Sequence, residues 1–257
     1  MQYPKKLYLC TQMATYFNIN YEFDRDVVLR QIDRTIANNG LGYVCVADGV
    51  ILNLVDRMPG YKEVVNGSMF SICDSSYVPL YLRWLYGLRL TNYTGSDIFG
   101  DIIRMRRYRM MFLGASQEIL DALRGKLTET DPRIADMTFV ELPFCKVEDF
   151  DYASIARQVE ADRPDIIWVS LGAPKQEIFM SMLKPHLSRG VMIAVGAAFK
   201  FYSGKGERRA PQWMLDHRLE FLFRLMMAPR KQLNRCAWII RTLPGLLYRE
   251  WKSKRHV

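Results

Sequence analysis

The sequence lacks several features that would place it in common protein classes. No uninterrupted apolar run reaches the roughly 20 residues of a membrane-spanning helix, and residues 1–7 lack the apolar stretch of a secretory signal. The 5 cysteines include no C-x-x-C pair, and the 3 histidines show no zinc-like spacing. We therefore expect a cytoplasmic protein, soluble or peripheral to a membrane, with reduced cysteines and no bound metal.

Positive charge is concentrated in the C-terminal segment. The chain has a net charge of +9, and 9 basic residues against the single acid Glu250 lie between Phe221 and the C-terminus. Residues 1–220 are therefore nearly neutral, whereas in residues 221–257 cations alternate with aromatic and aliphatic side chains. We expect a globular domain over 1–220 and a basic, amphipathic helical appendage over 221–257, broken into short helices at Pro229, Pro244 and Gly245.

Such an appendage suits an anionic membrane surface or nucleic acid. Interfacial helices combine a Lys/Arg face with a Trp/Leu/Phe face, and each cation near an anionic leaflet adds about 1 kcal/mol. Nucleic-acid binding favours exposed aromatic residues with fewer aliphatic neighbours. We therefore expect membrane binding and no nucleic acid. The alternative is a helical pair that packs on the main domain and shows its charges to water.

Short apolar runs alternate with segments of helical periodicity along most of the chain. Residues 1–20 are expected to form an irregular or short-stranded start. Strands are expected at 43–47, 69–73, 110–113, 137–141, 165–170 and 191–195, and helices at 24–37, 118–127, 154–161 and 176–187. This alternation is typical of βαβ units. The predicted fold class is therefore α/β, a doubly wound, mainly parallel Rossmann-like sheet followed by the helical appendage.

Glycines follow several of the expected strands. In an open parallel sheet, ligands bind beyond the carboxyl ends of the strands. Gly114, Gly172 and Gly196 lie there, and glycine allows a sharp turn and a close approach of ligand to backbone, while the N-terminus of a following helix attracts an anion. The pattern favours a phosphate-bearing ligand. For residues 114–117, the tight turn that any doubly wound sheet needs is an equally good interpretation.

Several longer motifs are more specific. They are T-G-S-D at 94–97, F-L-G-A at 112–115, S-L-G-A-P-K-Q-E at 170–177, A-V-G-A-A-F-K-F-Y-S-G at 194–204, R-R-A-P-Q-W-M at 208–214, L-E-F-L-F-R-L at 219–225 and A-P-R at 228–230. In order and spacing, over roughly residues 24–235, the chain resembles the WecG/TagA/CpsF family of bacterial glycosyltransferases, glycosyltransferase family 26.

The resemblance implies a catalytic domain over 1–220 that transfers a sugar, of N-acetylmannosamine type or another hexose, from a UDP-sugar to a sugar on a polyprenyl diphosphate. Inversion at the anomeric carbon, no metal and no cofactor are implied. The products belong to cell-surface polysaccharides. The acceptor lipid lies in the membrane, so the appendage would hold the enzyme on the inner face of the cell membrane. Self-association of the chain through the apolar face of the appendage is a further expectation.

The expected chemistry needs a general base and groups that stabilise the departing diphosphate. Asp74 matches the position of the family's catalytic aspartate, and its place after a strand independently suits a base; a helix N-cap is the alternative. Pro174, at an expected helix start, is predicted to fix Lys175 and Gln176 at the rim of the sheet. Gln176 is expected to bind substrate and Lys175 to touch phosphate, although lysines at a rim are usually solvated.

Further candidates bind the diphosphate and the nucleotide. The expected diphosphate ligands are Arg208, Arg209, Arg224 and Arg230, because guanidinium groups bind phosphate oxygens in bidentate fashion. Each of these arginines taken singly also suits a surface ion pair. The expected nucleotide-binding residues are Gly114, Ala115, Ser116, Gly172, Pro174, Gly196, Phe199 and Lys200. Phe199 would offer a face to uracil, and core packing is an equally good interpretation of that ring.

Some positions depart from the family pattern. Val46 and Asp48 stand where the family commonly has Thr and Asn, Asn92 where an arginine is usual, Ser75 for glycine and Lys200 for aspartate. Asp48 and Asn92 are still expected to bind substrate. These changes leave the sugars unassigned, and they keep open a catalytically inactive scaffold that binds a nucleotide sugar.

The sequence offers weaker signals for two other kinds of site. No G-x-G-x-x-G motif opens the first βα unit, which counts against a dinucleotide-dependent oxidoreductase. The D-x-D at Asp149 and Asp151 could bind a divalent metal and UDP, but it lies before an expected helix, where acids favour the N-terminus.

Overall fold

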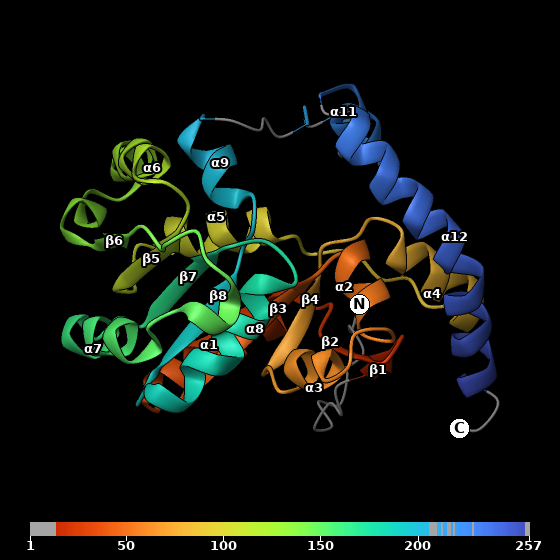
Figure 1. Cartoon of the computed structure of the whole chain (residues 1–257), viewed down its shortest axis with the longest axis horizontal. Helices are drawn as coiled ribbons and strands as arrows, with labels where there is room; N and C mark the ends of the chain where they lie inside the picture. The colour runs from red at the N-terminus through yellow and green to blue at the C-terminus, as the bar shows by residue number, and fades with distance from the viewer. Residues whose placement is uncertain are drawn as a thin grey trace, which may run out of the picture.

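The computed structural model describes residues 14–205, 210–211, 213–214, 217, 219–227 and 229–254 of the 257-residue chain. Within them an eight-stranded sheet has the order β1-β2-β4-β3-β8-β7-β5-β6 (Figure 1). The strands are β1 (Ala14–Tyr16), β2 (Ile19–Tyr21), β3 (Leu41–Ala47), β4 (Phe70–Cys73), β5 (Met110–Gly114), β6 (Thr138–Val140), β7 (Ile166–Ser170) and β8 (Gly190–Ala194). β1 runs antiparallel to β2, and the other pairs are parallel. The predicted mainly parallel α/β sheet is confirmed.

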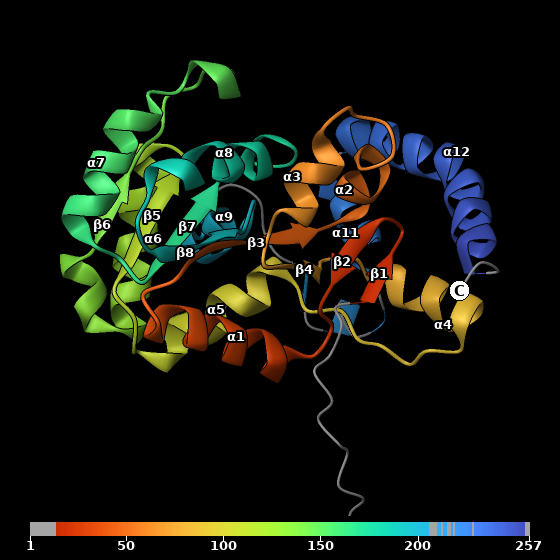
Figure 2. The same ribbon diagram turned by 90° about the horizontal axis from the view of Figure 1, so that it is seen from below.

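Helices cover both faces of this sheet (Figure 2). They are α1 (Arg25–Ala37), α2 (Gly49–Leu54), α3 (Tyr61–Asn66), α4 (Val78–Tyr86), α5 (Gly95–Met105), α6 (Gln117–Thr130), α7 (Tyr152–Asp162), α8 (Lys175–Leu183), α9 (Ala198–Ser203), α11 (Glu220–Met227) and α12 (Pro229–Lys254), with 3-10 turns η1 (Pro132–Asp136), η2 (Val147–Asp149) and η3 (Lys184–His186). Buried side chains of α2, α3, α4, α7 and α8 form the core on one face, and those of α1, α5, α6 and α9 form the core on the other.

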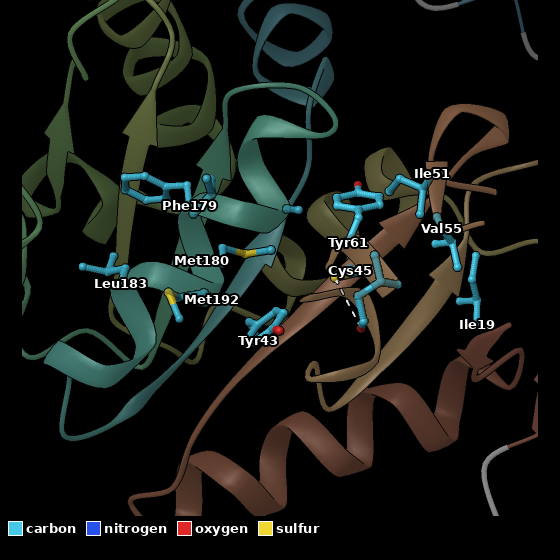
Figure 3. Close-up of a cluster of buried hydrophobic side chains, with 14 of the residues drawn as sticks. Ile19, Tyr43, Cys45, Ile51, Val55, Tyr61, Phe179, Met180, Leu183 and Met192 are labelled. Carbon is cyan, nitrogen blue, oxygen red and sulfur yellow. Dashed lines mark hydrogen bonds between the residues drawn. The ribbon is translucent and has the colours of Figure 1, made fainter. Parts of the chain in front are cut away.

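Alternation along the buried strands explains the two cores. In β7, Ile167 and Val169 face the core that includes α8, whereas Ile166 and Trp168 face the core that includes α5. Trp168 is fully buried, and its ring centroid lies 4.8 Å from that of Phe99 on α5. Figure 3 shows part of the first core, where side chains of α8 pack beside those of β3 and α3. A strand buried on both faces needs apolar residues throughout, which is why the expected strands could be found as continuous apolar runs.

The region between β3 and β5 contains elements that the sequence did not predict. The helices α2, α3, α4 and α5 lie there, and the β1–β2 hairpin within residues 14–21 agrees with the expected short-stranded start. Two of them, α2 and α3, have 6 residues each, too few for two turns of helical periodicity. The six expected strands and four expected helices all correspond to observed elements.

The appendage packs on the main domain through α12. Leu246 is buried, Thr242 Oγ1 donates a hydrogen bond to Asn53 on α2, and the Glu250 carboxylate accepts from Phe17 N at 2.7 Å and from Tyr86 Oη at 2.7 Å. The prediction that Pro244 and Gly245 break this segment was wrong, because α12 runs through both. Pro244 is exposed, so water can solvate the carbonyl group that its ring leaves without a partner.

Gly114, which ends β5, gives a test of this packing. Its φ is +102°, and a Cβ atom there would lie 2.5 Å from the carbonyl oxygen of Ser170. We expect Gly114→Ala to lower the free energy of unfolding by at least about 2 kcal/mol, because left-handed backbone strain and a backbone clash add together. Gly125→Ala on α6, where nothing lies within 4 Å, is the matched control and should raise it by about 0.5 kcal/mol. Equal urea midpoints for the two variants would contradict the packing described.

Candidate functional site

The carboxyl ends of five adjacent parallel strands meet at one rim of the sheet. In spatial order these strands are β4, β3, β8, β7 and β5, and the residues that follow them include Asp74, Asp48, Gly196, Gly172 and Ala115. The chain after β3 enters α2, in one core, whereas the chain after β8 enters α9, in the other. The two central loops therefore diverge to opposite faces. This is the topological switch point at which open α/β sheets bind ligands.

Asp74 lies at this rim and is held by backbone hydrogen bonds. Its N–H donates to Ala47 O at 3.0 Å, and its Oδ1 accepts from Gly95 N at 2.9 Å. Gly95 is the first residue of α5, so the carboxylate lies at the positive end of that helix. The alternative of a cap for the next helix is not what the structure has, since α4 begins at Val78 with no side-chain cap.

Gly95 joins this aspartate to the centre of the rim. Thr94 caps α5 in a capping box with Asp97, which fixes the start of the helix. A Cβ atom at Gly95 would lie 3.1 Å from Val46 Cγ1 and 3.6 Å from Val195 O. The start of α5 therefore packs between the ends of β3 and β8. The family-like T-G pair provides the small residue that this approach requires.

Gln176 bridges two loops of the rim from a buried position. Its Oε1 accepts from Gly172 N at 3.1 Å and from Gly196 N at 3.2 Å. Its Nε2 donates to Glu177 Oε1 at 2.8 Å. Both ends of the carboxamide are thus engaged within the protein. These contacts give Gln176 the role of holding the loops after β7 and β8 together, and contact with substrate stays a prediction.

Glu177 is a residue that the sequence analysis missed. Its side chain is fully buried, and Tyr61 Oη donates to its Oε2 at 3.1 Å. Burial raises the pKa of this carboxyl to about 7, and the nearby charge of Asp48 acts in the same direction. The spacing of Glu177, Met180 and Leu183 places the acid on the apolar face of α8, a signal that could have revealed it.

Asp48 and Lys175 have partners within the protein. Asp48 is the N-cap of α2, and its Oδ1 accepts from Val50 N at 2.8 Å and from Ile51 N at 3.1 Å. Lys175 is the first residue of α8, as Pro174 predicted, and its ammonium group donates to Cys145 O and lies 4.8 Å from the ring centroid of Phe150. The roles of both residues in substrate binding stay predictions.

Phe199 and the remaining loop residues differ in exposure. Phe199 is fully buried, and its ring centroid lies 5.8 Å from that of Phe99 and 6.0 Å from that of Phe112. Its ring therefore presents no face to uracil, and core packing is the interpretation that fits.

Lys200 is half-buried on α9. Gly172 and Gly196 have positive φ values of +78° and +49°, and Ser116 lies at the N-cap of α6. Glycine at both loops is therefore required by the backbone.

A cavity of about 760 Å³ opens beside the start of α5. It is lined by Phe23, Asp24, Arg25, Arg89, Leu90, Thr91, Asn92, Tyr93, Asp97, Asp101, Arg104 and Tyr202. Its most buried charge, Asp101, accepts from Tyr93 Oη at 2.8 Å and pairs with Arg25 at 2.8 Å and Arg104 at 2.5 Å. The volume suits a ligand of sugar or nucleotide size. Asn92 is exposed and lies in the segment that leads from this cavity to Gly95. Gly95 in turn donates its N–H to Asp74.

Four expected diphosphate ligands cannot be placed. Arg208 and Arg209 lie outside the described residues, as do the side chains of Arg224 and Arg230.

Within the described part of the chain, no group of three or more His, Cys, Asp or Glu side chains is arranged to hold a metal ion. In the D-x-D segment, Asp151 caps α7 by accepting from Ser154 N at 2.9 Å, as the helix interpretation expected.

The buried Glu177 makes stability depend on pH. Between the ordinary pKa of 4.5 and the folded pKa of about 7, the folded protein binds a proton that the unfolded chain has lost. The free energy of unfolding should therefore fall as pH rises through this window, by up to about 3 kcal/mol. Glu177→Gln cannot ionise, so it should show a flatter profile in urea unfolding at pH 5, 6, 7 and 8.

Glu118 on α6 is exposed, so Glu118→Gln is the control for removing a carboxylate. Its free energy of unfolding should follow the same pH profile as that of the wild type. A Glu177→Gln profile with the wild-type slope would show that this carboxyl keeps its ordinary pKa in the folded protein.

Comparison with known proteins identifies the family of this chain. The family described as "Glycosyl transferase WecG/TagA/CpsF family" matches residues 16–257. The N-acetylglucosaminyldiphosphoundecaprenol N-acetyl-beta-D-mannosaminyltransferase of Bacillus subtilis (strain 168) is 26% identical over 66% of this chain and 65% of its own length. The protein of the same name from Staphylococcus aureus (strain MW2) is 21% identical over 93% of both chains. The chain belongs to the WecG/TagA/CpsF family and is a glycosyltransferase.

Proposed function

We propose that this enzyme transfers a hexose-type sugar from a UDP-sugar to a sugar carried on a polyprenyl diphosphate, with inversion at the anomeric carbon. The names of its relatives support the acceptor class, since both describe transfer of N-acetylmannosamine to an N-acetylglucosaminyl diphosphoundecaprenol. The expected product is a lipid-linked intermediate of a cell-surface polysaccharide.

The position of Asp74 carries this proposal. Its carboxylate lies at the rim, beside the switch point, and the hydrogen bond from Gly95 N fixes one of its oxygens. In an inverting transfer the base takes the proton of the acceptor hydroxyl while that oxygen bonds to the anomeric carbon. The bond from that carbon to the diphosphate breaks at the same time, and UDP leaves with the electron pair. A single carboxylate on the face opposite the leaving group suffices for this chemistry.

The leaving diphosphate needs donors at the same rim. The N-termini of α6 and α8 follow the loops after β5 and β7, and their backbone N–H groups and dipoles favour an anion. We propose that residues Gly114 to Ser116 and Gly172 to Pro174 approach the nucleotide there. We propose that Arg208, Arg209, Arg224 and Arg230 add charge-assisted bonds to the diphosphate.

The acceptor lipid requires a membrane, and α12 offers a surface for it. The exposed apolar side chains described on α12 include Leu233, Ile240, Tyr248 and Trp251, together with Ala237 and Pro244. Their spacing of 3 or 4 residues places them in one stripe, with the exposed Arg241 and Lys252 beside it. Within the described ranges no helix combines the length and the apolar character needed to cross a bilayer. We propose that this stripe lies in the interface of the cytoplasmic leaflet.

The departures from the family pattern bear on the donor and acceptor sugars. Asp48 caps α2 at the rim, and Asn92 lines the cavity beside α5. We propose that these two residues contribute to the choice of sugar. Asp74, Gly95 and the Gln176 bridge are all in place, and this intact arrangement favours an active enzyme over an inactive scaffold of the same fold.

Replacing the base tests the reaction directly. Asp74→Asn keeps an oxygen that can accept from Gly95 N but cannot take a proton, so turnover should fall at least about 100-fold. The measurement is UDP release from UDP-N-acetylmannosamine with a polyprenyl-diphosphate-linked N-acetylglucosamine acceptor. Asp136→Asn removes an exposed carboxylate and should keep wild-type turnover. Equal rates for Asp74→Asn and the wild type would remove Asp74 from its role.

The membrane surface has a separate test. The double variant Ile240→Ser with Tyr248→Ser should reduce partition onto phosphatidylglycerol vesicles at least about tenfold, because two apolar side chains no longer enter the interface. Phe144→Ser with Met182→Ser, which removes two exposed apolar residues elsewhere, is the control. Unchanged vesicle binding by the Ile240→Ser, Tyr248→Ser variant would contradict a membrane role for the stripe. If that variant also lost a dimer that the wild type forms, the stripe would serve self-association.

A further inference from the structure

Glu177 and Gln176 form a buried polar chain between α3 and the rim. Tyr61 on α3 donates to Glu177 Oε2, Gln176 Nε2 donates to Glu177 Oε1, and Gln176 Oε1 accepts from two backbone N–H groups. Tyr61 lies among the side chains packed between α3, β3 and α8 (Figure 3). Tyr61, Gln176 and Glu177 are all nearly or fully buried, so a broken link in this chain could not be repaired by water without opening the core.

The carboxyl group of Glu177 decides which way the carboxamide of Gln176 points. A carboxamide has an accepting oxygen at one end and a donating NH₂ at the other. In either protonation state the Glu177 carboxyl keeps an oxygen that only accepts. With that oxygen, Oε1, facing the NH₂ end of the carboxamide, the carboxamide oxygen faces the N–H groups of Gly172 and Gly196. The reversed amide would place two donors against the Gly172 N–H and Gly196 N–H donors. Glu177 therefore sets the orientation on which the bridge depends.

The bridge holds the loops after β7 and β8 against each other. Ser170 Oγ donates to Gly196 O at 2.6 Å, which links the end of β7 to the loop after β8 as well. Val195, directly before Gly196, lies against Gly95, and Gly95 N donates to Asp74. A continuous set of contacts thus leads from Glu177, through Gln176 and the loop after β8, to the carboxylate at the reacting centre.

We propose that Glu177 is a positioning residue of this transferase: it orients the Gln176 carboxamide, which holds the 171–173 and 195–197 loops in the geometry that Asp74 and the diphosphate require. The catalytic part of this role rests on the proposed function. The effect of Glu177 on the two loops does not depend on any substrate. Glu177 itself, being fully buried, touches neither sugar nor phosphate.

Three variants separate positioning from simple core stability. Glu177→Met keeps an unbranched side chain of similar length but offers no oxygen to Gln176. Glu177→Gln keeps an accepting oxygen for Gln176, and its amide group can donate to Tyr61 Oη, so it is the conservative rescue. Leu183→Val trims another fully buried side chain of α8, outside the polar chain, and serves as the matched control for lost core packing.

The first readout is independent of turnover. Amide hydrogen exchange at Gly172 and Gly196 reports the two hydrogen bonds that Gln176 accepts. We expect Glu177→Met to lose about tenfold or more of the protection at both amides, while Glu177→Gln and Leu183→Val keep it within about twofold. Unchanged protection in Glu177→Met would overturn the proposal.

The second readout is the steady-state rate of UDP release with the acceptor described above. We expect kcat of Glu177→Met to fall about tenfold or more with a smaller change in KM for the donor, and Glu177→Gln to recover most of the loss. Lost amide protection with unchanged kcat would also overturn the catalytic role. A wild type that turns over no UDP-sugar would reject the proposed function and the catalytic role together, and the exchange rates would still decide whether Glu177 holds the loops.

Discussion

The hydrogen bond from Gly95 N to Asp74 is the contact on which the site depends, because it fixes the carboxylate at the junction of three segments. Asp74 directly follows β4, Gly95 begins α5, and the close approach of Gly95 to Val46 and Val195 ties both to the centre of the sheet. A side chain at position 95 would separate α5 from the ends of β3 and β8. The proposed base is therefore placed by backbone atoms at the sheet rim and at the start of α5, and rigid elements of this kind give a site precise geometry.

The parallel sheet explains why residues far apart in the sequence share one rim. Strand polarity brings the ends of β3, β4, β5, β7 and β8 together, and the crossing of the chain to the opposite face after β8 separates the two central loops. The Gln176 bridge then joins the loops after β7 and β8. The appendage adds a different element: one face of α12 packs on α2, and the opposite face shows an apolar stripe. The proposed chemistry and the proposed membrane surface thus lie on different elements, the sheet and the appendage.

The sequence predicted the sheet well because strands buried on both faces read as continuous apolar runs, as in β7 and β8. It also located Asp74 and the loops at the strand ends. It could not show that Phe199 is a core ring, since an aromatic residue after a glycine loop suits either role, or that Gln176 turns inward. Glu177 was missed because a charged residue beside a lysine and a glutamine looks like surface, and only tertiary packing reveals its burial. The prediction that Pro244 breaks the helix failed because Pro244 is exposed on α12, where water can replace the missing hydrogen bond.

The most direct test of the account is a structure of the protein with UDP bound. The account predicts that the diphosphate lies at the switch point, within hydrogen-bond reach of the loops that follow β5 and β7, with the place of the anomeric carbon open to Asp74. A UDP molecule seated at another part of the surface, with Asp74 turned away from its diphosphate, would contradict the account.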